Sequence, residues 1–127
     1  MRSPRKRVHT APSEAVALSK ATIRSASKLG LPNSTLASIL GVSQATVSRM
    51  AKGSYSPKRG EKTFELSVLF VRLYRSLDAI VGGDDEVAGL WLRNPNTVLC
   101  DKPINLIKSV QGLVNVIQYL DARRAIV

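Results

Sequence analysis

Six polar or cationic residues stand close together in the middle of the chain, at a spacing that suits contacts with nucleic acid. They are Ser43, Gln44, Thr46, Ser48, Arg49 and Lys52. Proteins use hydroxyl, amide and guanidinium groups to hydrogen-bond base edges in the major groove and the phosphates beside it. We expect Gln44, Thr46 and Arg49 to read base edges directly. The other three, Ser43, Ser48 and Lys52, are expected to hold phosphates.

Catalytic chemistry has little support in the sequence. His9 is the only histidine and Cys100 the only cysteine, so a Cys/His nucleophile or a metal cluster is not expected. No histidine stands near Cys100 or Ser109, and no Gly-rich phosphate loop follows a predicted strand. We therefore predict a protein that is not an enzyme, with no catalytic residue, no metal and no cofactor. Cys100 is interpreted as a buried or partly buried packing thiol in a reducing cytoplasm.

Residues 33–53 contain the features of a helix-turn-helix that would position the six polar side chains. Two helices that cross steeply need a small residue in the first helix and a residue tolerant of positive φ in the turn, and Ala37 and Gly41 supply these. Ser43 is placed to cap the second helix. The apolar wedge is expected from Leu36, Ile39 or Leu40, Val42, Val47 and Met50. A plain helical hairpin would show this wedge without the polar, cationic outer face.

The net charge of +10 is concentrated in one half of the chain. Residues 1–62 carry twelve basic and two acidic residues, whereas residues 63–127 carry seven of each. A basic half that meets a polyanion and a neutral half that meets protein would explain this asymmetry, and DNA binding would then depend strongly on salt. The alternative of a mitochondrial transit peptide at the basic N-terminus is disfavoured because the helix-turn-helix already accounts for the charge. No apolar run is long enough to predict a membrane span.

We predict an all-α fold in four parts. Residues 1–12 are expected to be a disordered basic arm, 13–55 the helix-turn-helix region, 56–63 a linker, and 64–127 a helical dimerisation and partner-binding module. The first helix would be capped by Ser13 and end before Gly30. Lys20, Arg24 and Lys28 share one face of it, which is either a solvated charged face or a stripe that follows phosphates.

The pattern of apolar residues and helix caps in the second half predicts four helices. Residues 64–81 are apolar on more than one face, which is typical of a helix central to a fold or a dimer. Asp84 or Asp85 would cap a short helix through Arg93, and Pro103 would open another. Trp91 is interpreted as a core anchor rather than an interface hot spot. The last helix, about 109–124, is expected to bury Val110, Leu113, Ile117 and Leu120.

Two sets of residues resemble known families. Gly41-Val42-Ser43-Gln44 and Val47-Ser48-Arg49 resemble the Xre-type helix-turn-helix of phage and bacterial repressors. The second half resembles the antitoxin module of the Xre/MbcA/ParS family at Trp91-Leu92, Asn94-Pro95-Asn96, Leu99, Pro103, Gly112-Leu113 and Tyr119-Leu120-Asp121-Ala122 with Arg124. Together the resemblance spans roughly residues 15–127.

This resemblance implies a bacterial, cytoplasmic antitoxin of a type II toxin-antitoxin system. Such proteins bind and block a RES-domain toxin that degrades NAD, and repress their own operon through the helix-turn-helix. A homodimer that pairs through the helix over residues 64–81 is expected within a larger toxin-antitoxin complex. Tyr119, Arg123 and Arg124 would cover the NAD cleft of the toxin. Alternatively, the two arginines only favour the negative end of the last helix. The competing function is a stand-alone transcriptional regulator whose second half senses a ligand or another protein.

Overall fold

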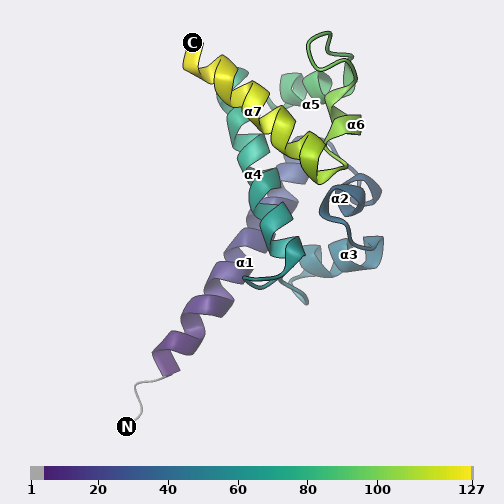
Figure 1. The fold of residues 1–127 in the computed structure, drawn as a ribbon. Helices are drawn as coiled ribbons and strands as arrows, with labels where there is room; N and C mark the ends of the chain where they lie inside the picture. The colour runs from purple at the N-terminus through teal and green to yellow at the C-terminus, as the bar shows by residue number, and fades with distance from the viewer. Residues whose placement is uncertain (1–4, 127) are drawn as a thin grey trace.

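The computed structural model describes residues 5–126, and within them the side chains of residues 14–125. That part of the chain folds into helices without a β-strand beyond one isolated bridge, so the predicted all-α class is confirmed (Figure 1). The helices are α1 (Arg5–Lys28), α2 (Asn33–Leu40), α3 (Gln44–Lys52), α4 (Lys62–Ile80), α5 (Asp85–Arg93), α6 (Pro103–Leu106) and α7 (Val110–Ile126). No helix among the described residues combines the length and the apolar character that crossing a membrane requires.

The central helix is α4, as its apolar character predicts. It packs most extensively against α7 and α1, and also contacts α2 and α5 (Figure 1). Its buried side chains include Leu66, Phe70, Leu73 and Leu77, which lie toward several neighbours at once. A helix covered on so many sides is the scaffold on which the other elements are placed.

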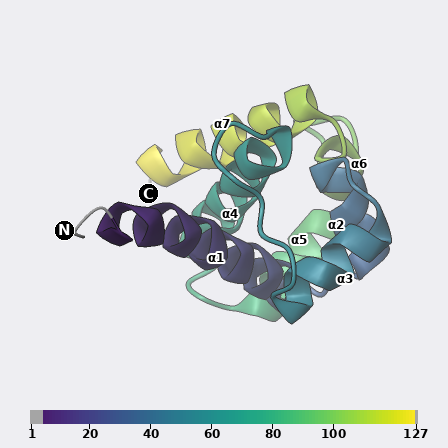
Figure 2. The ribbon, with the colours of Figure 1, turned by 90° about the horizontal axis from the view of Figure 1, so that it is seen from below.

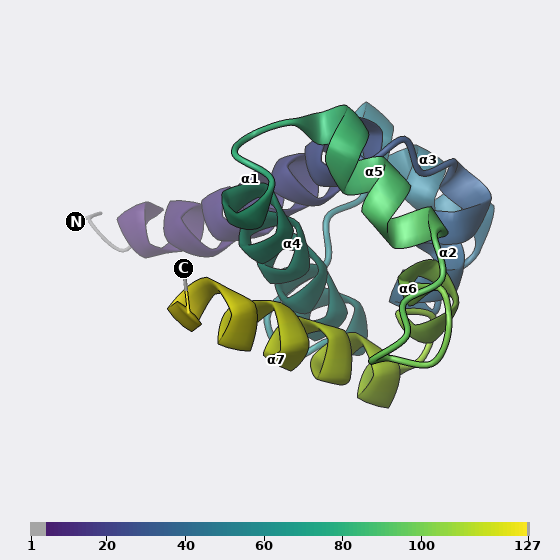
Figure 3. The same ribbon diagram turned by 90° about the horizontal axis from the view of Figure 1, so that it is seen from above.

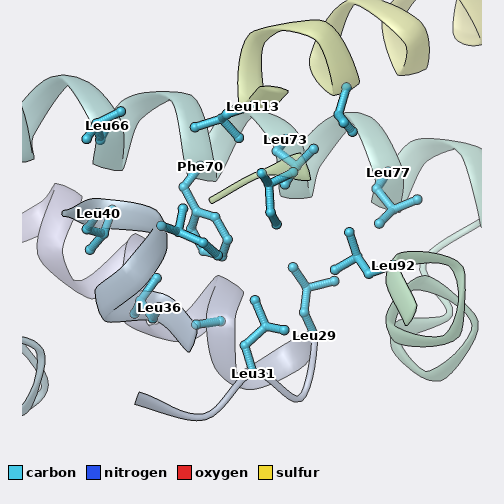
Figure 4. Packing of buried hydrophobic residues seen from close by; sticks show 14 of the residues in the cluster. Leu29, Leu31, Leu36, Leu40, Leu66, Phe70, Leu73, Leu77, Leu92 and Leu113 are labelled. Carbon is cyan, nitrogen blue, oxygen red and sulfur yellow. The ribbon is translucent and has the colours of Figure 1, made fainter. Parts of the chain in front are cut away.

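One hydrophobic core joins the two halves of the chain. Leu36 of α2, Phe70 of α4, Leu92 of α5 and Leu113 of α7 belong to a single cluster and are each at most 1% exposed (Figure 4). Replacing such a leucine by alanine typically lowers the free energy of unfolding by about 2–5 kcal/mol. The helix-turn-helix and the C-terminal helices therefore stabilise each other.

Several predicted helix ends are confirmed. Gly30 follows α1 with φ +71°, a conformation that glycine adopts without strain. Asp84 caps α5, since its Oδ1 accepts a hydrogen bond of 3.1 Å from the backbone N–H of Val87. Pro103 opens α6.

The start of α1 differs from the prediction. The helix begins at Arg5 rather than after Ser13, so the backbone of residues 5–12, expected as a disordered arm, is helical. Lysine, arginine and alanine in this segment favour helix, whereas Pro12 disfavours a helix interior, so residue propensity accounts for only part of this difference. Residues 1–4 of the predicted arm lie outside the described residues.

Two side chains predicted to be buried are exposed. Cys100 lies on the surface with φ +66°, in the loop closed by a backbone hydrogen bond from Asn96 N to Asp101 O of 3.1 Å. This loop projects between α5 and α6, so the thiol does not reach the core. Val110 is 51% exposed because it begins α7, whereas Leu113, Ile117 and Leu120 are buried as predicted.

Candidate nucleic-acid and partner-binding surfaces

The α2–α3 pair has the geometry that the sequence predicts for a helix-turn-helix. Gly41 has φ +70° and its backbone N–H donates to the carbonyl of Ala37, which closes the turn. Ser43 caps α3, with its Oγ accepting a hydrogen bond of 3.1 Å from the backbone N–H of Thr46. The wedge residues Leu36, Ile39, Leu40, Val47 and Met50 are buried, and Val42 packs partly buried against them.

On the outer side of α3, hydroxyl and guanidinium groups form a short hydrogen-bonded chain. Ser43 Oγ lies 3.0 Å from Thr46 Oγ1, and Arg49 Nη2 donates to the same Thr46 oxygen at 3.1 Å. Arg49 is exposed, and Thr46 holds its guanidinium against the helix. A held arginine loses less freedom when it binds a base or a phosphate.

The remaining predicted residues lie elsewhere around α3. Gln44 and Lys52 are exposed, and Ser48 is half-buried. At about 100° of rotation per residue, Gln44 and Thr46 lie about 200° apart, at opposite edges of the exposed face. The structure thus places Arg49 and Lys52 at the middle of that face.

Ala45 was not assigned a contact from the sequence, yet it is exposed near the centre of the same face. A methyl group at that place can contact the thymine methyl in the major groove. The feature that could have drawn attention to it is a small apolar residue among polar neighbours in the first turn of α3.

The basic stripe on α1 is exposed at Lys20, Arg24 and Lys28. Lys28 Nζ lies 6.0 Å from the ring centroid of Tyr74 on α4, so this lysine also contacts its own chain. Burial and a hydrogen bond to Asp85 raise the pKa of Tyr74 to about 12, which keeps its hydroxyl a neutral donor.

A second surface forms where α7 meets α5. The rings of Tyr119 and Trp91 stack with centroids 6.2 Å apart and an interplanar angle of 20°. Arg123 Nη1 donates to Tyr119 Oη at 3.2 Å, and the guanidinium carbon lies 5.6 Å from the centroid of that ring. Trp91 is half-buried and packs against the core, so it anchors an aromatic and cationic edge.

Arg124 lies apart from this edge, although it follows Arg123 in sequence. Its Nη1 donates to Ser76 Oγ at 3.3 Å, on the side of α7 that faces α4. Asp121 lies there too: its carboxylate accepts hydrogen bonds from Ser76 Oγ at 2.8 Å and from Arg72 Nη2 at 2.7 Å. These donors lower the pKa of Asp121, with Ser76 contributing most. The structure therefore brings Tyr119 and Arg123 together and separates them from Arg124.

The sequence did not predict one contact that joins the two halves of the chain. Arg93 Nη2, at the end of α5, donates to the carbonyl oxygens of Leu29 at 3.2 Å and Gly30 at 2.8 Å, in the turn that follows α1. A Cβ at Gly89 would lie 3.0 Å from the Leu29 oxygen, so the glycine lets α5 approach α1 closely. More than sixty residues separate Arg93 from these carbonyls, and no local pattern indicates the pairing.

These features define a helix-turn-helix DNA-binding protein joined through one core to a helical partner-binding module. Comparison with protein families identifies both parts. Residues 9–72 match the antitoxin Xre-like helix-turn-helix domain, and residues 76–125 match the antitoxin Xre/MbcA/ParS C-terminal toxin-binding domain. The chain therefore belongs to the Xre-like antitoxins, and the family predicted by resemblance is confirmed. No curated protein matches the sequence significantly.

Proposed function

We propose that this antitoxin binds and blocks a RES-domain toxin that degrades NAD and that, as a homodimer, it represses its own operon through α3. The observation that carries the proposal is the exposed polar and cationic face of α3 within one antitoxin domain, joined to a second domain that matches a toxin-binding family. The toxin class follows from the family resemblance described above.

On the DNA side, we propose that Gln44, Thr46 and Arg49 contact base edges. Ser43, Ser48 and Lys52 would bind phosphates. A symmetric dimer presents two α3 helices related by a twofold axis, so the operator should contain inverted half-sites. The excess of basic over acidic residues in residues 1–62 supports a strong dependence of affinity on salt concentration.

On the toxin side, we propose that the last turns of α7 cover the NAD cleft. Tyrosine and arginine are enriched among residues that dominate binding energy, and Tyr119 and Arg123 present both groups in one pre-organised contact. Arg124 would add a cation from the neighbouring side of the helix. The exposed Val98, at 68%, offers apolar surface in the same domain.

The test is to co-express the chain with the product of the adjacent gene. Size exclusion with light scattering should show a stable complex, and the isolated neighbour should consume NAD while the complex should not. Footprinting of the shared promoter should reveal inverted half-sites whose protection weakens as salt rises. An adjacent product that does not bind would contradict the proposal, and DNA binding controlled by a small ligand would support the stand-alone regulator instead.

A further inference from the structure

An open groove lies between the three longest helices, α1, α4 and α7. α1 and α7 lie on either side of α4, as the views from below and above both show (Figures 2 and 3). The groove has a volume of about 960 Å³ and is lined by small and apolar side chains, which include Ala17, Ala21, Val68 and Val71. Val68 keeps 44% of its surface exposed although it lies in the middle of α4. Such a surface suits a partner that contributes apolar side chains.

The groove is also cationic. Arg72, Arg75 and Arg124 line it together with one acid, Asp121, so its ionised side chains carry a net charge of +2. Asp121 is already paired with Arg72 at 2.7 Å. Arg75 makes no ion pair with any residue whose side chain the structure describes. The occupant should therefore combine negative charge with apolar groups.

The chain carries a surface of that kind at the turn between α4 and α5. Asp84, Asp85 and Glu86 follow one another there, and Asp84 and Glu86 are exposed. In the first two turns of α5, Val87 is 45% and Leu90 is 53% exposed. Three consecutive acids beside two exposed apolar side chains complement the groove in both charge and polarity.

We propose that the groove receives the acidic α4–α5 turn and the start of α5 of a second copy, which receives the same elements in return. Both surfaces adjoin the C-terminal end of α4, because Arg75 lies in its last two turns and Asp84 follows Ile80 by four residues. If the twofold axis lies beside this end of α4, the acidic turn of each copy can enter the groove of the other. The two contacts are then equivalent, and the dimer is closed. The inference rests on the proposed homodimer and assigns its interface.

Direct pairing of the exposed α4 faces is a poorer arrangement. That face carries Arg72 and Arg75, so a twofold axis across it would bring arginines of the two copies together. Like charges placed opposite each other in an interface cost several kcal/mol. Exchange of the acidic turn avoids this repulsion and covers Val68 in addition.

The experiment uses two charge reversals on the full chain, Arg75→Glu and Glu86→Arg. Each should raise the dimer dissociation constant at least roughly tenfold, because each places like charges in both copies of the interface. An equimolar mixture of the two variants should dimerise again. In one groove of the mixed dimer the two introduced side chains face each other with opposite charges, and the other groove keeps the natural pair. Lys108→Glu, an exposed cation outside both surfaces, is the matched control and should dimerise like the natural chain.

Light scattering measures the oligomeric state, and circular dichroism at each step confirms that the helices remain folded. Dimers that survive both single reversals would overturn the interface, as would two monomeric variants that fail to pair when mixed. A natural chain that is monomeric at all concentrations would overturn both this inference and the proposed dimer, while DNA and toxin binding would still be measured separately. Loss of toxin binding in Arg75→Glu without a change in oligomeric state would assign the groove to the toxin instead.

Discussion

α3 and α7 carry the residues proposed for DNA and for toxin, and they hold them in different ways. The polar side chains proposed for DNA make their hydrogen bonds within α3 and its cap, as those of Ser43, Thr46 and Arg49 do. Those of α7 are held by other helices through the Trp91–Tyr119 stack and the contact of Arg124 with Ser76. A surface of the first kind is encoded locally, whereas one of the second kind depends on packing between distant segments. Variants of α3 should therefore change binding alone, and variants of α7 should also change stability.

The largest expected effect is on DNA binding. Replacing both Gln44 and Arg49 by alanine should remove two proposed base contacts, each worth about 1–3 kcal/mol of affinity. Operator affinity, measured by fluorescence anisotropy at fixed salt, should fall by at least roughly thirtyfold, and by far more if both contacts are strong. Toxin binding and the thermal midpoint should stay close to those of the natural chain, because both side chains are exposed. Full repression by the double variant would show that α3 does not read the operator.

The next effect separates the two neighbouring arginines of α7. Arg123→Ala should weaken toxin binding by about 2 kcal/mol, nearly thirtyfold, since it removes the guanidinium held on Tyr119. Arg124→Ala is the matched variant and should weaken it less, because this side chain lies toward Ser76. Titration calorimetry with an inactive toxin measures both. An equal loss in the two variants would mean that the toxin contacts both sides of α7.

A third prediction tests the dependence of α7 on packing. A Cβ at Gly112 would overlap the backbone carbonyl oxygen of Leu106, an atom that cannot move without shifting α6. Gly112→Ala should therefore lower the free energy of unfolding by about 1–3 kcal/mol despite the better helix propensity of alanine. Urea denaturation measures it, and Asn115→Ala, at an exposed site on the same helix, should change stability by no more than about 0.5 kcal/mol. Equal stability of the two variants would show that α6 and α7 are not in close contact.

The same contrast explains which parts of the fold the sequence predicts. Ala37, Gly41 and Ser43 act on residues within a few positions of themselves, so their spacing was enough to place the turn and the cap of α3. Leu66, Phe70, Leu73 and Leu77 recur at helical spacing, so the central place of α4 could also be predicted. Local hydrogen bonds and periodicity account for both successes.

The failures involve contacts that no local pattern encodes. The exposure of Cys100 follows from the loop that Asn96 and Asp101 close, and a cysteine with positive φ is not expected from residue type. The separation of Arg123 from Arg124 depends on where α5 and α4 lie relative to α7. The contact of Arg93 with the carbonyls of Leu29 and Gly30 joins the two halves across more than sixty residues. Tertiary packing decides each of these.

The smallest expected effect comes from Asp121, which joins α7 to α4. Its pKa in the folded chain lies below the reference value of 3.8, because Ser76 and Arg72 donate to the carboxylate. The charged form therefore contributes stability at pH values above 3.8, and this contribution is lost as the pH falls through the lower folded pKa. Because the ion pair with Arg72 is largely exposed, the contribution should be about 0–1 kcal/mol.

Asp121→Asn should thus be slightly less stable than the natural chain at neutral pH, and urea denaturation should show the difference shrinking in acid. Ser76→Ala, which removes the main donor, should reduce the same pH dependence, and a difference that grows in acid would mean that the carboxylate is not stabilised by these contacts.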